Sequence, residues 1–195
     1  ELGVRNIWVG GGGLHCGSGA HVAAGMVNSS WSIVPDFSLC NYIIYFGTNK
    51  GTGAGHSSVF SQRMAAEARA RGGKLVVFDP MCHQAVAKAT EWVPVIPGTD
   101  GAIALAMCNV IVNELGKWDE LYLKTKSNGV YLVGPDGRYV RDKETSKPLV
   151  WDAGEEKAKV HDAPSVKDFD LLGVYKVDGV KGQAGFAVIM TLVKE

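Results

Sequence analysis

The chain has 195 residues, of which 46% are hydrophobic, and this suffices for one α/β domain with a single core. Its 20 Lys and Arg residues balance its 20 Asp and Glu residues. This balance argues against the broad basic face with which proteins hold nucleic acid or an anionic membrane surface. We therefore expect one domain, residues 1–195, which contacts neither nucleic acid nor a membrane.

Targeting signals and metal-binding patterns are not evident. The apolar runs are all shorter than a membrane span, and residues 1–5 do not resemble a signal peptide. The chain does not begin with Met, so we expect a soluble piece of a longer protein, with periplasmic and cytoplasmic locations both open. The cysteines are too widely spaced for a metal site, and we expect Cys40, Cys82 and Cys108 to be packing residues.

The first part of the chain is rich in glycine. Residues 5–9 predict a short buried strand, and Gly10–Gly13 predict a loop after it. A helix over residues 15–27 would make this loop a candidate phosphate loop, but Gly17, Gly19 and Gly25 weaken that helix. A flexible connector is the better interpretation. The adjacent residues His15 and Cys16 are not spaced to bind one metal ion together.

Three apolar runs in the middle of the chain each lead into a short polar turn. The runs, which predict strands, are residues 42–46, 74–78 and 92–96. The turns are residues 47–49, 79–80 and 97–100. In a parallel sheet the carboxyl ends of the strands line one edge, so we expect these turns to converge on a single crevice where a ligand binds.

The segments between these strands predict a Rossmann-like, doubly wound α/β sheet with helices on both faces. Residues 57–71 predict a helix with Phe60, Met64 and Ala68 on one face, ended by Gly72 and Gly73. The strand over residues 42–46 is apolar on both faces, which is typical of a sheet covered on each side.

The second turn carries a carboxylate in a suggestive position. Asp79 follows its strand directly, and Pro80 ends the strand because proline cannot donate a ladder hydrogen bond. We expect Asp79 to be exposed at the sheet edge, where a carboxylate can accept hydrogen bonds from both hydroxyls of a ribose. The alternative is an Asp that only opens a turn. His83 can reach a phosphate when protonated, although a partly exposed surface histidine is the simpler interpretation.

The third turn, Pro97-Gly98-Thr99-Asp100, precedes a helix over residues 101–114 that is apolar nearly all round, so we expect the helix to be buried. Thr99 or Asp100 is well placed to cap it. A functional role competes with capping, because the two adjacent donors on the Watson-Crick edge of guanine match one carboxylate. Adenine presents an acceptor where guanine presents a donor, so the same carboxylate would reject it.

The rest of the chain predicts smaller elements. Residues 130–140 predict a hairpin with its turn at residues 134–137, and residues 141–159 predict an exposed extended loop. Residues 176–180 predict a short strand or turn. Residues 184–195 predict a last helix with Phe186, Ile189, Met190 and Val193 facing inward. We expect these residues to serve packing.

Taken together, several phrases resemble one enzyme family. They are residues 46–49 (Phe-Gly-Thr-Asn), 77–80 (Val-Phe-Asp-Pro), 92–102 with the Pro-Gly-Thr-Asp turn, 131–133 (Tyr-Leu-Val) and 150–152 (Val-Trp-Asp). In this order they resemble the molybdopterin oxidoreductases of the dimethyl sulfoxide reductase family, from about residue 34 to the end. The chain differs from the usual family pattern after Asp79-Pro80, where Met81 and His83 replace an arginine and a hydroxyl residue.

The resemblance implies a cofactor and a role. Catalytic subunits of that family bind molybdopterin guanine dinucleotide with molybdenum or tungsten, and this chain resembles the α/β domain that holds the nucleotide end. It implies that Gly47 and Asn49 approach the pyrophosphate, Asp79 the ribose and Asp100 the guanine. The full set of expected cofactor-binding residues is Gly47, Thr48, Asn49, Asp79, Pro80, His83, Pro97, Gly98, Thr99 and Asp100.

The resemblance also implies partners and a lack of activity in isolation. The iron-sulfur cysteines and the protein ligand to the metal lie elsewhere in such enzymes, so we expect no catalytic residue and no metal ligand here. The expected partners are an iron-sulfur electron-transfer subunit, together with the other domains of the catalytic subunit. Two alternatives stay open: an NAD(P)-dependent oxidoreductase that uses Gly10–Gly13 as its phosphate loop, and an interaction domain that has lost its ligand.

Overall fold

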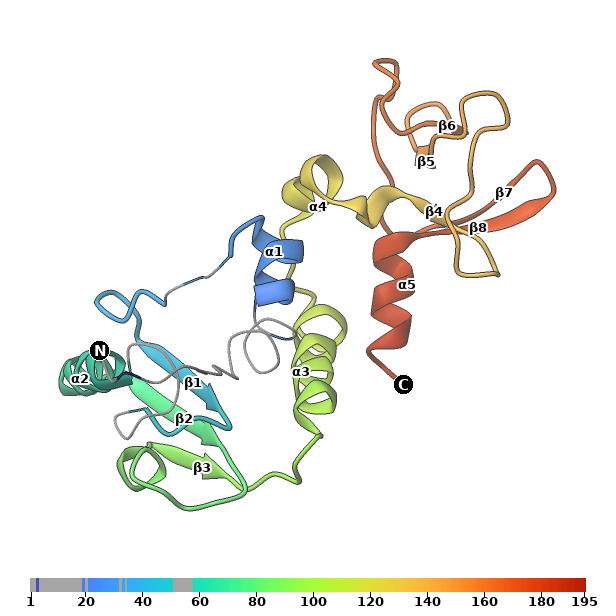
Figure 1. Ribbon diagram of the computed structural model, residues 1–195. Helices are drawn as coiled ribbons and strands as arrows, with labels where there is room; N and C mark the ends of the chain where they lie inside the picture. Colours follow the sequence, from blue (N-terminus) through green and yellow to red (C-terminus); the bar gives the residue numbers. More distant parts are fainter. Residues whose placement is uncertain (1–2, 4–18, 20, 32, 34, 51–57) are drawn as a thin grey trace. The chain divides into compact units, whose positions relative to one another are not determined.

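The computed structural model describes residues 3, 19, 21–31, 33, 35–50 and 58–195 (Figure 1). The chain divides into two compact units, Glu1–Ile96 and Pro97–Glu195. The predictions for residues 5–9, for Gly10–Gly13 and for the pair His15 and Cys16 lie outside the described residues. The single domain predicted over residues 1–195 stays a prediction.

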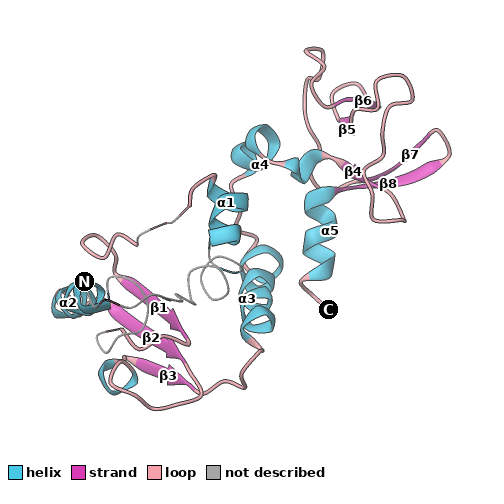
Figure 2. Cartoon of the chain, viewed as in Figure 1, coloured by secondary structure: helices cyan, strands magenta, loops and turns pink. Residues whose placement is uncertain are grey.

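The first unit contains a three-stranded parallel sheet, in agreement with the predicted α/β class (Figure 2). Its strands, in sheet order, are β1 (Tyr42–Phe46), β2 (Lys74–Phe78) and β3 (Glu91–Val93). The helices of this unit are α1 (Val22–Asn28), α2 (Ser58–Ala70) and the short 3₁₀ helix η2 (Val86–Lys88). β1 and β2 pair in parallel, and the connection between them through α2 is the crossover that such a pair needs. Their carboxyl ends therefore share one edge.

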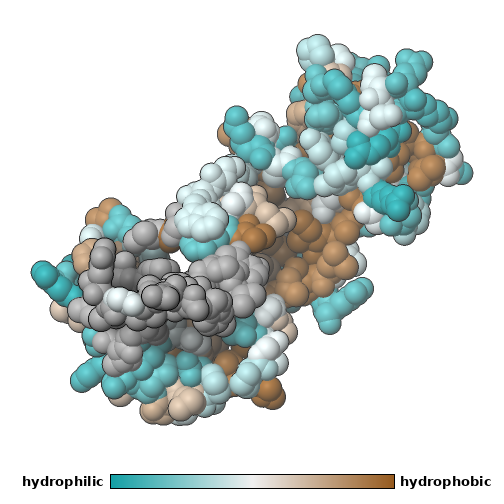
Figure 3. Space-filling view, in the orientation of Figure 1, coloured by the Kyte–Doolittle hydropathy of each residue, from teal (hydrophilic) through white to brown (hydrophobic). Residues whose placement is uncertain are grey.

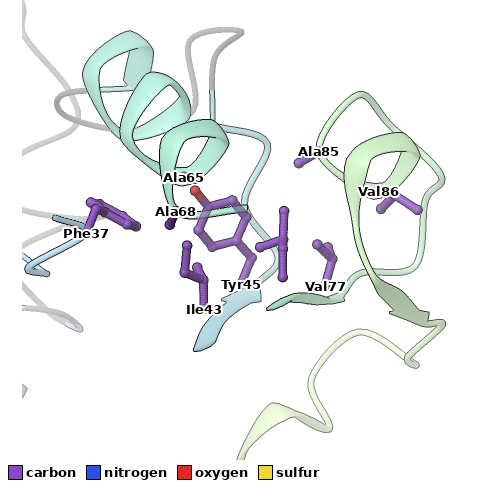
Figure 4. Packing of buried hydrophobic residues seen from close by; sticks show 9 residues of the cluster. Phe37, Ile43, Tyr45, Ala65, Ala68, Val77, Ala85 and Val86 are labelled. Carbon is purple, nitrogen blue, oxygen red and sulfur yellow. The ribbon is translucent and has the colours of Figure 1, made fainter. Parts of the chain in front are cut away.

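The core of this unit lies between α2, η2 and one face of the sheet (Figure 4). Ala65 and Ala68 of α2 pack against Ile43 and Tyr45 of β1 and Val77 of β2. Small alanine side chains let the helix approach the sheet closely. The predicted helical face was partly wrong, because Phe60 is 57% exposed while Ala65 and Ala68 are buried.

The other face of the sheet is less covered than predicted. Along β1, Ile43 and Tyr45 are buried, whereas Ile44 and Phe46 are exposed. The Phe46 ring stacks on Phe78 of β2 with centroids 4.7 Å apart. Burial in β1 therefore alternates as in a strand that is covered on one face, since α2 and η2 lie against the same side.

The second unit begins with helices and continues with antiparallel strands. Its helical elements are α3 (Asp100–Asn109), the π-helical turn η3 (Val110–Glu114), α4 (Glu120–Lys126), the 3₁₀ turn η4 (Asn128–Val130) and α5 (Gly185–Leu192). Its strands are β4 (Leu132–Val133), β5 (Leu149–Asp152), β6 (Lys157–Val160), β7 (Val174–Val177) and β8 (Val180–Ala184). They form one sheet of order β4-β8-β7 and the separate hairpin β5-β6.

Several predictions for this unit are confirmed. The turn at residues 134–137 closes a small hairpin, in which Gly134 N–H donates to the Arg138 carbonyl at 2.7 Å. The last helix is present as α5, with Phe186 and Val193 buried. Ile189, which was predicted to face inward, is 50% exposed, and hydrophobic side chains are visible on the surface over α5 (Figure 3).

Other predictions for this unit are wrong. Residues 141–159 are not an extended loop, because β5 pairs with β6 in register from Leu149 with Val160 to Asp152 with Lys157. Helix α3 is not buried, and Leu105 on it is 54% exposed. Cys108 is exposed for the same reason, and Cys82 in the first unit is exposed as well. Cys40 packs against the first core as predicted.

The β5-β6 hairpin is organised around the buried carboxylate of Asp152, whose side chain is fully inaccessible to solvent. Lys159 Nζ lies 2.6 Å from its Oδ2. The backbone N–H groups of Gly154, Lys167 and Asp168 donate to the same carboxylate at 3.0, 3.1 and 3.1 Å. Because buried polar groups need partners, this carboxylate fixes the hairpin to the segment at residues 165–168.

These contacts predict a specific acid sensitivity of the second unit. Hydrogen bonds from Lys157, Lys159 and Lys167 lower the pKa of Glu155 from 4.5 to about 2. The hydrogen bond from Lys159 is the largest influence on Asp152 and holds its pKa far below 3.8, although burial opposes this. A folded-state pKa below the unfolded value stabilises the fold at neutral pH, and this stabilisation is lost as the pH falls.

We therefore expect the thermal stability of the second unit to be nearly constant above pH 4.5 and to fall between pH 4.5 and pH 2. Thermal unfolding followed by circular dichroism over this pH range measures the effect. A Glu155→Gln variant, which cannot ionise, should show a smaller loss. An equal loss in the variant and in the original chain would contradict the role of Glu155.

Candidate functional site

Two loops lie next to each other at the carboxyl edge of the parallel sheet. Phe46 and Phe78, the last residues of β1 and β2, are paired in register. Gly47 N–H donates to the Phe78 carbonyl at 2.9 Å, so the two strands stay together up to the point where the loops begin. Gly47 has φ of +55°, and no described atom lies within 4 Å of the position that a Cβ would occupy. The backbone is therefore in a left-handed conformation, which suits glycine.

The side chain of Asn49 connects these two loops. Its Nδ2 donates to Gln84 Oε1 at 2.8 Å, and its Oδ1 accepts from Ala85 N–H at 3.3 Å. The carboxamide thus uses both its donor and its acceptor to hold the loop after β1 against the loop after β2. Thr48 beside it is half-buried.

Asp79 is buried, contrary to the prediction of an exposed carboxylate, because its side chain is only 9% accessible. Its Oδ1 accepts from Met81 N–H at 2.8 Å, and its Oδ2 lies 3.0 Å from His83 Nε2. The bond from Met81 N–H closes a turn that begins at Asp79, which agrees with the alternative of an Asp that opens a turn. The bond to His83, which lies further along the same loop, was not predicted. Trp92 Nε1 donates to the Asp79 carbonyl at 2.8 Å and fixes the backbone at this point.

The carboxylate of Asp79 is nevertheless held in its charged form. Burial raises its pKa, but the hydrogen bonds from Met81 N–H and His83 outweigh burial, and the net shift is downward. An ionised carboxylate has about four acceptor positions, and among the residues that the structure describes Met81 and His83 each occupy one. The group can therefore still accept hydrogen bonds from a ligand.

The geometry around His83 indicates which of its ring nitrogens carries the proton. Nδ1 accepts from Ala85 N–H at 3.2 Å, so it has no proton of its own in this arrangement. Nε2 faces Asp79 Oδ2, an acceptor, and must therefore be the protonated nitrogen. His83 is half-buried, in agreement with the prediction of a partly exposed histidine.

The third predicted turn belongs to the second unit. Gly98 has φ of +88°, and Thr99 occupies the N-cap position of α3 without a capping hydrogen bond from its side chain. Asp100 is the first residue of the helix and is exposed. Its carboxylate has no hydrogen bond or ion pair with any of the residues that the structure describes. A negative charge in the first turn stabilises a helix through the macrodipole, which is a weaker role than the predicted cap.

The structure thus brings together one subset of the predicted residues. Gly47, Thr48, Asn49, Asp79 and His83 lie in the two hydrogen-bonded loops, with Pro80 exposed at their rim. Pro97, Gly98, Thr99 and Asp100 form one turn in the other unit.

Sequence reasoning missed Gln84 and Ala85. Gln84 contributes its side-chain oxygen and Ala85 its backbone N–H. Both reach Asn49 only because of the way the loop after β2 folds, which no local sequence pattern reveals.

The described residues were also compared with the requirements of a metal site and of a membrane span. Within the described ranges, no three His, Cys, Asp or Glu side chains are placed to share a metal ion. None of the helices in that part of the chain has the length and hydrophobicity that a bilayer span requires.

Comparisons with known proteins give several reductase subunits as relatives. The chain is 31% identical over 130 residues to a putative catalytic subunit of dimethyl sulfoxide reductase from Halobacterium salinarum, a match that covers 63% of this chain and 15% of that protein. It is 31% identical over 124 residues to the alpha subunit of perchlorate reductase from Dechloromonas aromatica, covering 60% and 13%. It is 33% identical over 99 residues to the molybdopterin-containing subunit of thiosulfate reductase from Salmonella typhimurium, covering 51% and 12%.

No family model matches the chain. The chain spans between 12% and 15% of the length of these curated relatives. Matches of this extent, to several subunits of the same kind, agree with the family that the sequence motifs indicated. By sequence, the chain is a relative of the catalytic subunits of molybdopterin oxidoreductases, the dimethyl sulfoxide reductase family, and corresponds to one segment of them.

Proposed function

We propose that this chain is the part of a molybdopterin oxidoreductase catalytic subunit that holds the guanosine end of molybdopterin guanine dinucleotide. It acts by binding and has no activity alone. The complete enzyme transfers two electrons, often with an oxygen atom, between its substrate and the metal. The bound cofactor supplies this redox chemistry, whereas the residues of this chain supply orientation and electrostatics.

The observation that carries the proposal is the pair of loops at the carboxyl edge of β1 and β2. Ligands of open α/β sheets bind at this edge. Gly47 offers backbone in a left-handed conformation, and no described atom lies within 4 Å of the position of its Cβ, which favours the approach of a phosphate to the main chain. Asp79 offers an ionised carboxylate with unused acceptor positions on the neighbouring loop. These groups fit a pyrophosphate followed by a ribose.

Asp100 has the chemistry that guanine recognition requires. Its carboxylate is exposed and forms no hydrogen bond with the described residues, so it is available to a ligand. A carboxylate accepts from both N–H groups of the guanine edge at once, which a neutral amide cannot do. In the proposal, Thr99 and the tight turn at Pro97 and Gly98 set the position of this carboxylate at the start of α3.

The names of the relatives also suggest partners. The relatives from perchlorate reductase and sulfite dehydrogenase are named as subunits, which indicates assemblies of more than one chain. We propose that the protein containing this chain likewise works with other subunits, including one that carries electrons through iron-sulfur clusters. Its immediate partners are the other domains of the same catalytic subunit.

The test is an Asp100→Asn substitution in the complete catalytic subunit. The amide keeps the size of the side chain but replaces one acceptor by a donor, which opposes a donor of guanine. We expect metal content and bound nucleotide to fall by about tenfold, in line with the loss of a charged hydrogen bond. Metal is measured by mass spectrometry, and the nucleotide is released with acid and identified by chromatography as GMP.

The matched control is Asp178→Asn, which changes an exposed carboxylate that forms an ion pair with Lys143 on the surface. This variant should keep its cofactor. Wild-type metal content in Asp100→Asn, or release of a nucleotide other than GMP from the original protein, would contradict the proposal. The NAD(P) alternative rests on Gly10–Gly13, which lie outside the described residues, and it stays a prediction.

A further inference from the structure

We infer that His83 is a positioning residue, which holds Asp79 in place and couples it through Ala85 to Asn49, so that the two loops recognise the nucleotide as one unit. The inference rests on the proposed function, because it concerns the same loops. It assigns to His83 a role other than the phosphate contact or the surface position that the sequence left open.

The hydrogen bonds form a continuous chain between the loops. His83 Nε2 lies 3.0 Å from Asp79 Oδ2, and its Nδ1 accepts from Ala85 N–H at 3.2 Å. The same N–H lies 3.3 Å from Asn49 Oδ1, so it is shared between the two acceptors. Asn49 also donates to Gln84 Oε1. Each group has the donor or acceptor that its neighbour requires.

The position of the proton on His83 fixes the donor and acceptor roles in this series of hydrogen bonds. Ala85 N–H is a fixed backbone donor and cannot be reversed, so Nδ1 must be an acceptor and Nε2 the donor. The donor is then directed at Asp79 Oδ2, while Met81 N–H serves Oδ1. The plane of the carboxylate is fixed from both sides by hydrogen bonds within the chain.

This arrangement has a consequence for binding. A buried carboxylate held in one orientation does not have to be ordered when a ligand arrives, so less conformational entropy is lost on binding. The remaining acceptor positions of Asp79 keep a constant direction. A shift of Asn49 is transmitted to Asp79 through Ala85 and His83, since these two residues carry hydrogen bonds between them.

The first experiment compares two substitutions of His83 in the complete catalytic subunit. His83→Leu removes both hydrogen bonds, and we expect cofactor retention to fall by about tenfold. His83→Gln places an amide N–H where Nε2–H was, and we expect retention within about threefold of the original protein. The matched control is His161→Gln in the second unit, which should not change retention. Circular dichroism verifies that each variant is folded.

The second experiment measures coupling. Asn49→Ala and Asp79→Asn are made singly and together, and retention is compared in a double-mutant cycle. Residues in one hydrogen-bond network usually show coupling, and we expect a factor on the order of 10 in the original protein. In the His83→Leu background the factor should fall close to one. A factor that is unchanged in that background would overturn the inference.

A third measurement does not depend on the cofactor. In the cofactor-free subunit with ¹⁵N-labelled histidine, the signals of His83, assigned from their loss in His83→Gln, should report a proton on Nε2 and none on Nδ1. The opposite tautomer would overturn the inference. If His83→Leu retains its cofactor while Asp79→Asn loses it, the inference is wrong and the proposed function stands. If Asp79→Asn and Asp100→Asn both retain their cofactor, the proposed function fails and the inference fails with it.

Discussion

An Asp152→Asn substitution is expected to lower the midpoint of thermal unfolding by about 10 °C or more, because it leaves a buried ammonium group without its closest partner. Lys159 Nζ lies 2.6 Å from the carboxylate, and the Lys159 side chain is only 8% accessible. The asparagine amide is neutral, and its NH₂ group would face groups that now donate hydrogen bonds to the carboxylate. The expected loss is therefore far larger than for a surface ion pair.

The control for this substitution is Asp178→Asn, the same chemical change in an ion pair whose side chains are 79% and 64% accessible. Surface pairs contribute about 0–1 kcal/mol, so its midpoint should stay within a few degrees of the original. Unfolding is followed by tryptophan fluorescence, since Trp151 lies in the same strand and stacks on Tyr175 with centroids 3.9 Å apart. Equal midpoints for the two variants would show that the buried network does not stabilise the hairpin.

Gly73→Ala is expected to destabilise the first unit by about 1–3 kcal/mol, the cost of forcing an added methyl group into packed backbone. A Cβ at Gly73 would lie 2.8 Å from the Ala68 carbonyl oxygen and 3.3 Å from that of Asn41. Both are backbone atoms, and neither can rotate away. Gly73 N–H also donates to the Ala68 carbonyl at 2.9 Å, so the end of α2 and the start of β2 would have to separate.

Gly25→Ala is the matched control for this prediction. Gly25 lies within α1 of the same unit, and no described atom lies within 4 Å of the position of its Cβ. Alanine is favoured over glycine in a helix by about 0.5–1 kcal/mol, so this variant should be as stable as the original or more stable. Urea unfolding of both variants gives the two free energies. A loss for Gly25→Ala as large as for Gly73→Ala would refute the steric explanation.

The sequence by itself determined the α/β class and the places of the first two parallel strands. Strongly apolar runs such as Tyr42–Phe46 and Lys74–Phe78 can be recognised locally, and the helix predicted between them supplies the crossover that parallel neighbours need. It also indicated the family, because several short phrases, among them the turn ending at Asp100, follow one another in the order found in that family. The relatives found by comparison agree with that family.

Burial was less well predicted, because it depends on which elements pack against each other. The apolar helix α3 was expected to be buried, yet its side chains, including Cys108, remain accessible. The charged segment that contains Lys159 was expected to be an exposed loop, yet it forms a strand whose lysine is buried against Asp152. Hydrophobicity is a property of one side chain, whereas burial depends on which elements pack around it. Lys159 and Asp152 can both be buried because each is the partner of the other's charge.

Only the tertiary structure decided the state of the candidate site. Asp79 was identified from its place after a strand, but its burial and its bond to His83 depend on how the following loop folds back. The contact between Asn49 and Ala85 joins residues 36 positions apart, and one partner is a backbone N–H that every residue except proline possesses. A sequence records which side chains are present, but the hydrogen bonds of a loop depend on backbone geometry that residues distant in the chain impose.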